Sequence, residues 1–390
     1  MKLVSKLACL RDQHRPVLLA AGFFDGVHRG HQAIIRKIVS AARRERGTAW
    51  VMTFDTHPLK VLFPSSAPRL LTSTPHKLRL LKALGVHGCI VIPFTRALAR
   101  REPKALIAML ALAAPALRQI VIGRNWTFGR QGRGTPAMLK ALAPAYGFKI
   151  TVIPPVRWHG AVVSSTRIRA AVLAGRLAEA AGMLGRPFSL LGTVVPGRGL
   201  GRKLGIPTAN LNLHNEMAPP DGVYIVRARW DGVAYPGIAN LGVQPTIKHV
   251  ERRALSAERV LTSDLCRPSS CVCPPASCPP LDARRSTLHV LLPSSVLELH
   301  LFGLRRNLYG KAIEVTFLKK LRRERVFPSL EALQRQIRKD ITRAKAWLER
   351  KKYANARNHS GAIIQNEDLP SVGHGKPCQE TGFGILDSVF

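Results

Sequence analysis

Blocks of apolar and polar residues alternate along the first part of the chain. Short apolar runs predict buried strands at residues 17–21, 48–54, 88–92, 119–122 and 149–153. Apolar residues at helical spacing between these runs predict helices at residues 32–46, 75–84, 103–112 and 136–146. Because buried strands alternate with helices, we expect an α/β domain, a doubly wound parallel sheet covered by helices on both faces.

The pattern changes at residues 185–188, where glycine and proline interrupt a helical segment. Beyond this point, short alternating segments predict strands at residues 192–195, 222–230, 235–241 and 297–302. A long basic helix is predicted at residues 328–349, and no periodicity follows it. Its apolar stripe consists of Leu330, Leu333, Ile337, Ile341 and Trp347. We therefore place one domain at residues 1–186, a second at 187–350 and a disordered tail at 351–390.

The composition is that of a globular protein with an unusual charge. The chain has 390 residues, enough for two domains with separate hydrophobic cores, and 46% of them are hydrophobic. The formal net charge of +37 suits an anionic partner, which could be a nucleotide, a nucleic acid or a membrane surface. Because the basic residues are scattered and only 6% of residues are aromatic, the sequence disfavours a dedicated single-strand nucleic-acid binder.

The N-terminal segment and the cysteines bear on where the protein works. Lys6, Arg11 and Asp12 interrupt any apolar leader segment, and no run elsewhere reaches the roughly 18 apolar residues that a membrane span needs. The cysteines number seven, and this odd number does not suggest a disulfide framework. We therefore expect a cytoplasmic protein.

A segment at about residues 251–295 is rich in cysteine and proline. It contains Cys266, Cys271, Cys273 and Cys278 at the spacing C-x4-C-x-C-x4-C. These cysteines could bind a soft metal ion, but the paired C-x2-C spacing that is typical of zinc sites is missing. A surface insertion without a metal is the interpretation that we favour.

The stretch GFFDGVHRGH, residues 22–31, joins the first predicted strand to the first predicted helix. It predicts a glycine-rich turn at a helix N-terminus, where unpaired backbone N–H groups and the helix dipole favour a bound anion. His28 and His31 can donate hydrogen bonds to a phosphate and to the charge that grows on it during nucleotidyl transfer, while Gly30 lets the backbone approach. Taken alone, the two histidines could also be ordinary polar turn residues.

This stretch resembles the GxFDGxHxGH signature of the bifunctional bacterial riboflavin kinase/FAD synthetase family, whose first domain is an HxGH nucleotidyltransferase. The resemblance implies that His28 and His31 are catalytic. A second similarity lies in GRNWTFG, residues 123–129, which is similar to the family's G-x-[ND]-F-x-F-G element. The implied ATP contacts are Gly22, Phe24, Asp25 and Gly26, and the implied flavin contacts are His57, Pro58 and Asn125.

The segment SSTRIR, residues 164–169, precedes another predicted helix. Ser164 or Ser165 is a natural N-cap, and capping alone would explain the serines. The family has a very similar S-S-T-x-I-R element beside the triphosphate. The resemblance therefore implies that Ser164, Ser165, Thr166 and Arg169 contact ATP phosphates, through hydroxyl, backbone N–H and guanidinium donors.

A loop rich in glycine and basic residues, residues 196–210, suits close approach to a phosphate, with Gly201 and Arg202 as candidates. Its last residues, GIPTAN, resemble the signature of the riboflavin kinase fold, a small antiparallel Greek-key β-barrel with a C-terminal helix. The resemblance implies that Thr208 and Asn210 hold Mg²⁺ and an ATP phosphate. The block LELHLF followed by NLYG is also similar to the family, and it implies that Glu298 is a general base.

The resemblance as a whole implies a bifunctional enzyme of FAD biosynthesis. With ATP and Mg²⁺, the second domain would phosphorylate riboflavin to FMN, and the first would transfer AMP to FMN, giving FAD and pyrophosphate. The expected partners are these small molecules, without a nucleic acid or a membrane, and the chain would be a monomer or a weak homo-oligomer. Two alternatives stay open: a nucleotidyltransferase with another acceptor, and a basic RNA-binding protein built on an inactive enzyme scaffold.

Overall fold

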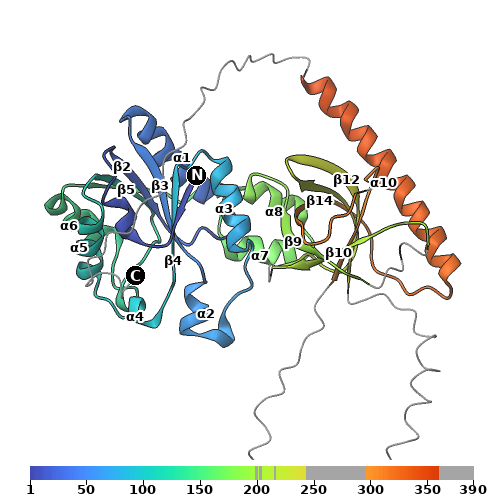
Figure 1. Cartoon of the computed structure of the whole chain (residues 1–390), viewed down its shortest axis with the longest axis horizontal. Coiled ribbons are helices and arrows are strands. Elements are labelled where there is room, and N and C mark those ends of the chain that lie inside the picture. Colours follow the sequence, from blue (N-terminus) through green and yellow to red (C-terminus); the bar gives the residue numbers. More distant parts are fainter. Residues whose placement is uncertain (198–200, 202–203, 215–216, 243–295, 305, 360–390) are drawn as a thin grey trace, which may run out of the picture.

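The computed structural model describes residues 1–197, 201, 204–214, 217–242, 296–304 and 306–359. Figure 1 shows a sheet with its helices at one side and a barrel at the other, with α7 and α8 between them. The predicted insertion at 251–295, with its cysteine cluster, lies outside the described residues, and so does Arg202.

The first domain is built around a parallel sheet. Its elements are β1 (Lys2–Val4), β2 (Val17–Ala21), α1 (Arg29–Arg44), β3 (Thr48–Phe54), α2 (Pro58–Leu62), α3 (Thr74–Ala83), β4 (Gly88–Ile92), α4 (Arg96–Ala99), α5 (Pro103–Ala113), β5 (Leu117–Gly123), α6 (Pro136–Leu142), β6 (Lys149–Ile153), β7 (Arg157–Trp158), β8 (Ala161–Val162), α7 (Ser165–Leu173) and α8 (Leu177–Leu184). The strand order in the six-stranded sheet is β1-β4-β3-β2-β5-β6, and every neighbouring pair is parallel. The predicted doubly wound sheet is confirmed.

Helices cover both faces of this sheet. On one face, α1 buries the apolar positions expected from its spacing, including Ile34, Ile35 and Ile38, against β2, β3 and β5. On the other face, Ile107 and Leu110 of α5 pack in a second cluster. The chain therefore leaves β2 toward one face and enters β5 from the other. Doubly wound folds bind their ligands where the connections diverge in this way, so we expect the ligand site at the carboxyl ends of β2 and β5.

Two local differences from the sequence analysis have physical causes. Strand β1 was not predicted, because three residues with Lys2 among them carry no periodic signal; it is a strand because it pairs with the edge of β4. The helix expected to run to residue 146 ends at Leu142 and continues as a 3₁₀ turn over Ala143–Tyr146. Pro144 explains the change, since it lacks the N–H that an α-helix would use.

The second domain is a closed antiparallel barrel. Its strands are β9 (Ser189–Val195), β10 (Ala209–Leu213), β11 (Gly222–Trp230), β12 (Val233–Gly242), β13 (Val296–Leu301) and β14 (Ala312–Arg322). They close in the order β10-β13-β12-β11-β14-β9, with β9 also paired to β10. Strands β10 and β14 were not predicted. In β10, two asparagines reduce the strand propensity, and its pairing with β9 and β13 closes the barrel.

Helix α10 (Leu330–His359) packs along the barrel (Figure 1). Ile337, Ile341 and Trp347 from its predicted stripe pack against the hydrophobic cluster that includes Ile225 and Ile238 of the barrel. Leu330, which was also assigned to the stripe, is 38% exposed. The helix passes the expected domain end at residue 350, so the tail predicted at 351–390 begins as helix, and residues 360–390 lie outside the described part of the chain.

The length of the chain suggested two domains with separate hydrophobic cores, but in the structure the two cores are partly joined. One hydrophobic cluster contains Ile168 of α7 and Met183 of α8 together with inward-facing barrel residues such as Tyr224 and Phe317. Leu71, from the loop before α3, belongs to the same cluster. The chain division near residue 186 therefore crosses a continuous apolar core, which fixes the barrel against the sheet domain.

A buried polar contact also joins the domains. The Nε2 atom of His76 in α3 lies 3.3 Å from the Oε1 atom of Glu314 in β14, and the hydroxyl of Ser189 donates to the same oxygen at 2.9 Å. Burial alone would raise the pKa of Glu314, but the hydrogen bonds from His76 and Ser189 and the charge of Arg186 lower it to about 2. The carboxylate is therefore held in its charged form at the junction.

We expect Glu314→Gln to lower the Tm by about 2–4 °C at neutral pH, because a charged hydrogen-bond acceptor is lost from the junction. A depressed carboxyl pKa gives stability that is present above 4.5 and is lost as the pH falls through about 2. The Tm difference between parent and variant should therefore shrink over this pH range, which thermal unfolding monitored by circular dichroism can measure. Glu102→Gln, at an exposed ion pair, is the matched control and should have little effect. A difference that does not change with pH would contradict this role for Glu314.

Candidate active sites

The turn that follows β2 has a left-handed backbone at three residues. The φ angle is 55° at Phe24, 76° at Gly26 and 41° at Val27. Gly26 tolerates this conformation, but Val27 is β-branched and is strained there. A Cβ atom at Gly26 would also come within 2.9 Å of the Leu71 side chain. The turn is thus a specific and costly shape that the surrounding residues must hold.

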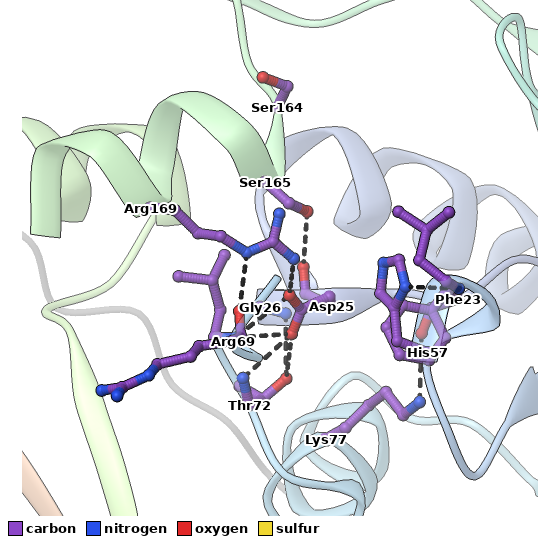
Figure 2. A network of polar contacts seen from close by, with 12 residues as sticks. Phe23, Asp25, Gly26, His57, Arg69, Thr72, Lys77, Ser164, Ser165 and Arg169 are labelled. Carbon is purple, nitrogen blue, oxygen red and sulfur yellow. Dashed lines mark hydrogen bonds and ion pairs between the residues drawn. The ribbon is translucent and has the colours of Figure 1, made fainter. Parts of the chain in front are cut away.

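Asp25 is the centre of the contacts that hold this turn (Figure 2). Its buried carboxylate accepts hydrogen bonds from the backbone N–H groups of Leu71 and Thr72, each at 3.0 Å, and pairs with Arg169 at 2.5 Å. The hydroxyl of Ser165 donates to the Asp25 carbonyl at 3.1 Å. These bonds tie the turn to the loop before α3 and to the first turns of α7.

These contacts change the expectation for two residues. Both carboxylate oxygens of Asp25 accept hydrogen bonds from protein groups, and a carboxylate has no hydrogen to donate to a phosphate. The guanidinium of Arg169 is turned toward Asp25 and toward the carbonyl of Arg69, at 2.9 Å. Both side chains therefore hold the shape of the turn in this structure, and their contacts with ATP stay a prediction.

The paired histidines lie where the turn enters α1. His28 is the N-cap of α1, and its Nδ1 atom accepts from the backbone N–H of His31 at 3.4 Å. The two imidazoles stack with their centroids 3.6 Å apart. A Cβ atom at Gly30 would come within 3.1 Å of the His28 ring, so the glycine leaves space for this stacking. The structure therefore brings both histidines and Gly30 together at a helix N-terminus.

The electrostatics keep these imidazoles neutral. Burial, and then the charge of Arg186, lower the pKa of His28 to about 4. Burial is also the main cause that lowers the pKa of His31, well below its usual range. Because the Nδ1 atom of His28 accepts a hydrogen bond, the proton of the neutral ring lies on Nε2, which can donate to a ligand. The buried Nδ1 atom of His31 has no hydrogen-bond partner within the described residues.

Other predicted residues lie around this turn. Phe24 packs edge-on against His31, and Phe23 packs edge-on against His57, whose Nδ1 atom caps α2. Pro58 is the first residue of α2, and Gly22 lies between β2 and the strained turn. The remaining candidates belong to neighbouring elements: Ser164 caps α7, Thr166 is exposed in its first turn, and Asn125 is exposed after β5.

Lys77 of α3 is a buried cation that the sequence analysis did not identify. Its Nζ atom donates to the carbonyls of Phe23 and Phe54, at 3.2 and 2.9 Å, and to the hydroxyl of Thr53 at 3.0 Å. The side chain is 2% exposed, and burial lowers its pKa to about 8. Lys77 thus joins the segments at the carboxyl ends of β2 and β3, and Figure 2 shows it reaching Phe23.

We expect Lys77→Met to lower the free energy of unfolding by about 2–4 kcal/mol, because three acceptors at this buried position lose a charged donor. Chemical denaturation of the full chain measures this change. The matched control is Lys82→Met, at an exposed position of the same helix, where an effect within about 0.5 kcal/mol is expected. Equal effects of the two substitutions would contradict the structural role of Lys77.

The barrel brings its candidate residues to β10 and β13. Glu298 of β13 is half-buried and lies directly opposite Asn210 of β10 and Asn240 of β12. Burial, and then the charge of Glu324, raise the pKa of Glu298. A carboxylate with a raised pKa is a stronger base. Glu324, which follows β14, was not predicted because no motif includes it.

The glycine-rich loop lies close to the predicted metal ligands. A Cβ atom at Gly197 would overlap the Asn210 amide, and one at Gly201 would lie 2.7 Å from the Thr208 hydroxyl. The loop backbone therefore lies directly on both side chains, whose hydroxyl and amide oxygens are hard donors that suit Mg²⁺. Within the part of the chain that the structure describes, no group of histidine, cysteine and acidic residues could hold a metal ion.

Comparisons with known proteins identify both domains. Residues 10–167 match the family model described as FAD synthetase, and residues 184–348 match the model described as riboflavin kinase. A crystal structure described as a macrolide-efflux protein from Streptococcus pneumoniae has a TM-score of 0.64, with 25% identity over 87% of this chain and 97% of that chain.

Among the described residues, no helix has the length and apolar character to cross a membrane.

Relatives of known name align with most of this chain and with most of their own length. The bifunctional riboflavin kinase/FMN adenylyltransferase of Escherichia coli K12 is 31% identical over 83% of this chain and 90% of its own. The protein of the same name from Haemophilus influenzae is 31% identical over 84% of this chain and 93% of its own. The chain therefore belongs to the family of bifunctional riboflavin kinase/FMN adenylyltransferases.

Proposed function

We propose that the two domains catalyse consecutive reactions, with the barrel making FMN from riboflavin and ATP, and the sheet domain making FAD from FMN and ATP. One observation carries the proposal. In each domain, motif residues that are distant in sequence gather where that fold can bind a nucleotide: at the carboxyl ends of β2 and β5, and beside β10 and β13.

In the sheet domain, an oxygen of the FMN phosphate attacks the α-phosphorus of ATP, and the bond to the departing pyrophosphate breaks. The N–H at Nε2 of neutral His28 donates a hydrogen bond to a phosphate oxygen as negative charge grows there. The ring of His31 stacks on that of His28, and the first backbone N–H groups of α1 favour negative charge at the same helix N-terminus. Ser164 and Thr166 at the start of α7, and Asn125 after β5, are candidate contacts to ATP and flavin.

In the barrel, Glu298 takes the proton of the ribityl 5′-hydroxyl as that oxygen attacks the γ-phosphorus, and ADP leaves. Its raised pKa suits this role. Thr208 and Asn210 would hold Mg²⁺ with water and phosphate completing its ligands, and the ion when bound would neutralise phosphate charge. The Gly201 backbone, which lies against Thr208, would approach the same phosphates.

We propose a cytoplasmic enzyme that acts as a monomer or weak homo-oligomer, with small molecules as its partners. The surplus of basic residues, with a net charge of +37, supports anionic substrates such as ATP and FMN.

The direct test is to incubate the purified chain with riboflavin, ATP and Mg²⁺ and to separate the flavins by chromatography. FAD that appears after FMN would support both sites at once. If supplied FMN is converted to FAD but riboflavin is not phosphorylated, the proposed kinase activity is wrong and the proposed adenylyltransferase activity is supported. If neither flavin reacts, the proposed function is wrong.

A further inference from the structure

Arg186 lies in the connection between α8 and β9, outside every motif considered so far. Its guanidinium reaches back into the strained turn of the sheet domain. Nη2 donates to the carbonyl of Gly26 at 2.9 Å, and Nη1 donates to the carbonyl of Val27 at 3.3 Å. The side chain is half-buried. One planar group thus binds two successive carbonyls of the turn that carries the paired histidines.

These two carbonyls belong to the costly part of the backbone. Gly26 and Val27 have φ angles of 76° and 41°, and His28 follows immediately as the N-cap of α1. Gln32 reinforces the same attachment, since its Nε2 atom donates to the carbonyl of Val27 at 2.9 Å and to that of Leu184 in α8 at 2.7 Å. The left-handed turn is therefore fixed to the end of α8 by two side chains.

The charge of Arg186 also matters at this position. Two carbonyl oxygens turned toward the same group would place partial negative charge near a phosphate site, and the guanidinium compensates for it. The same charge helps to keep His28 neutral, in addition to burial. On the barrel side, Arg186 acts on Glu314, because it is one of the groups that lower the pKa of that carboxyl. Arg186 thus lies between the turn and the barrel.

We propose that Arg186 is a positioning residue of the FMN adenylyltransferase site, holding the turn at Gly26 and Val27 in the shape that presents His28 to the nucleotide. The inference rests on the proposed function of the sheet domain. It implies that this site is completed by the connection to the kinase barrel, so that the two catalytic units are not independent modules. The two hydrogen bonds that carry the proposal lie on the sheet-domain side, at Gly26 and Val27.

The first test compares Arg186→Met and Arg186→Lys in the full chain, with FMN adenylylation and riboflavin phosphorylation measured on the same preparations. We expect Met to lower kcat/KM for FMN adenylylation by about 10- to 100-fold, because two charged hydrogen bonds to the turn are lost. Lys keeps the charge without the two-pronged donor and should recover part of the loss. Riboflavin phosphorylation should stay within about threefold of the parent, which also shows that the variants are folded.

The second test is chemical rescue of Arg186→Ala by free guanidinium at non-denaturing concentration. Guanidinium should raise FMN adenylylation by the variant and leave the parent and the kinase reaction unchanged, whereas methylammonium should be less effective. Full adenylylation by Arg186→Met would overturn the proposal. Equal loss of both reactions, or a loss that guanidinium does not restore, would also overturn it, since Arg186 would then serve only the fold. A parent chain that makes no FAD would instead refute the proposed function.

Discussion

Glu298→Gln should lower riboflavin phosphorylation by about 10²- to 10⁴-fold and leave FMN adenylylation unchanged. The reason is that glutamine has nearly the shape of glutamate but cannot take the proton of the attacking hydroxyl. Glu298 lies in the middle of β13, paired with β10 and β12, so the substitution should not disturb the strand. Chromatography of the flavins formed from riboflavin, and separately from supplied FMN, measures the two reactions.

The matched control for Glu298 is the neighbouring carboxyl, in the variant Glu324→Gln. Its charge raises the pKa of Glu298, second to burial, so removing it should lower that pKa. The base form of Glu298 would then persist to lower pH, and the acid limb of the kinase pH profile should move to lower pH with little loss at the optimum.

Equal loss of FMN formation and FMN adenylylation in Glu298→Gln would refute the division of the two reactions between the domains.

The sequence predicts the sheet domain well because the apolar residues of its strands and those of its helices follow clear and different spacings. The apolar run at 17–21 and the spacing of Ile34, Ile35 and Ile38 predict β2 and α1, and the structure confirms both. The barrel is predicted less completely. Strand β10, with its two asparagines, has no local preference for a strand and depends on the pairing that closes the barrel.

The residues that hold the turn show why a site is harder to predict than a fold. Lys77 and Arg186 act through carbonyl oxygens, which every residue has, so no residue pattern marks their targets Phe23, Gly26 and Val27. They also reach the turn from α3 and from the end of α8. Only the tertiary packing of these elements brings them there, and single-sequence patterns carry no information on such long-range contacts.

Asp25 and Arg169 illustrate the opposite case, in which a motif is visible but the role of its members is not. Both are conspicuous in the sequence and both are near the proposed phosphate site. The structure pairs them with each other, so that the arginine charge is used to hold the carboxylate and the turn. A buried pair of this kind is strongly destabilising to break, because the remaining charge is left uncompensated.

His28→Ala should lower FMN adenylylation by about 10²- to 10³-fold, while riboflavin phosphorylation stays within about threefold of the parent. The expected loss is that of a preorganised donor to the charge that grows on the reacting phosphate. Alanine also removes the N-cap of α1, since the Nδ1 atom of His28 accepts from the N–H of His31. The loss of a cap costs about 1 kcal/mol of stability and could be mistaken for the loss of a catalytic group.

His28→Asn separates the two roles of this histidine. The asparagine side chain can accept from the N–H of His31 and keep α1 capped, but it cannot place a donor where the Nε2 atom of His28 lies. If His28 acts through its imidazole, Asn and Ala should lose FMN adenylylation to a similar extent, although Asn should keep the higher Tm. If Asn instead retains activity near that of the parent, the helix cap is what matters, and stabilisation of the phosphate charge must be assigned to His31 and the N–H groups of α1.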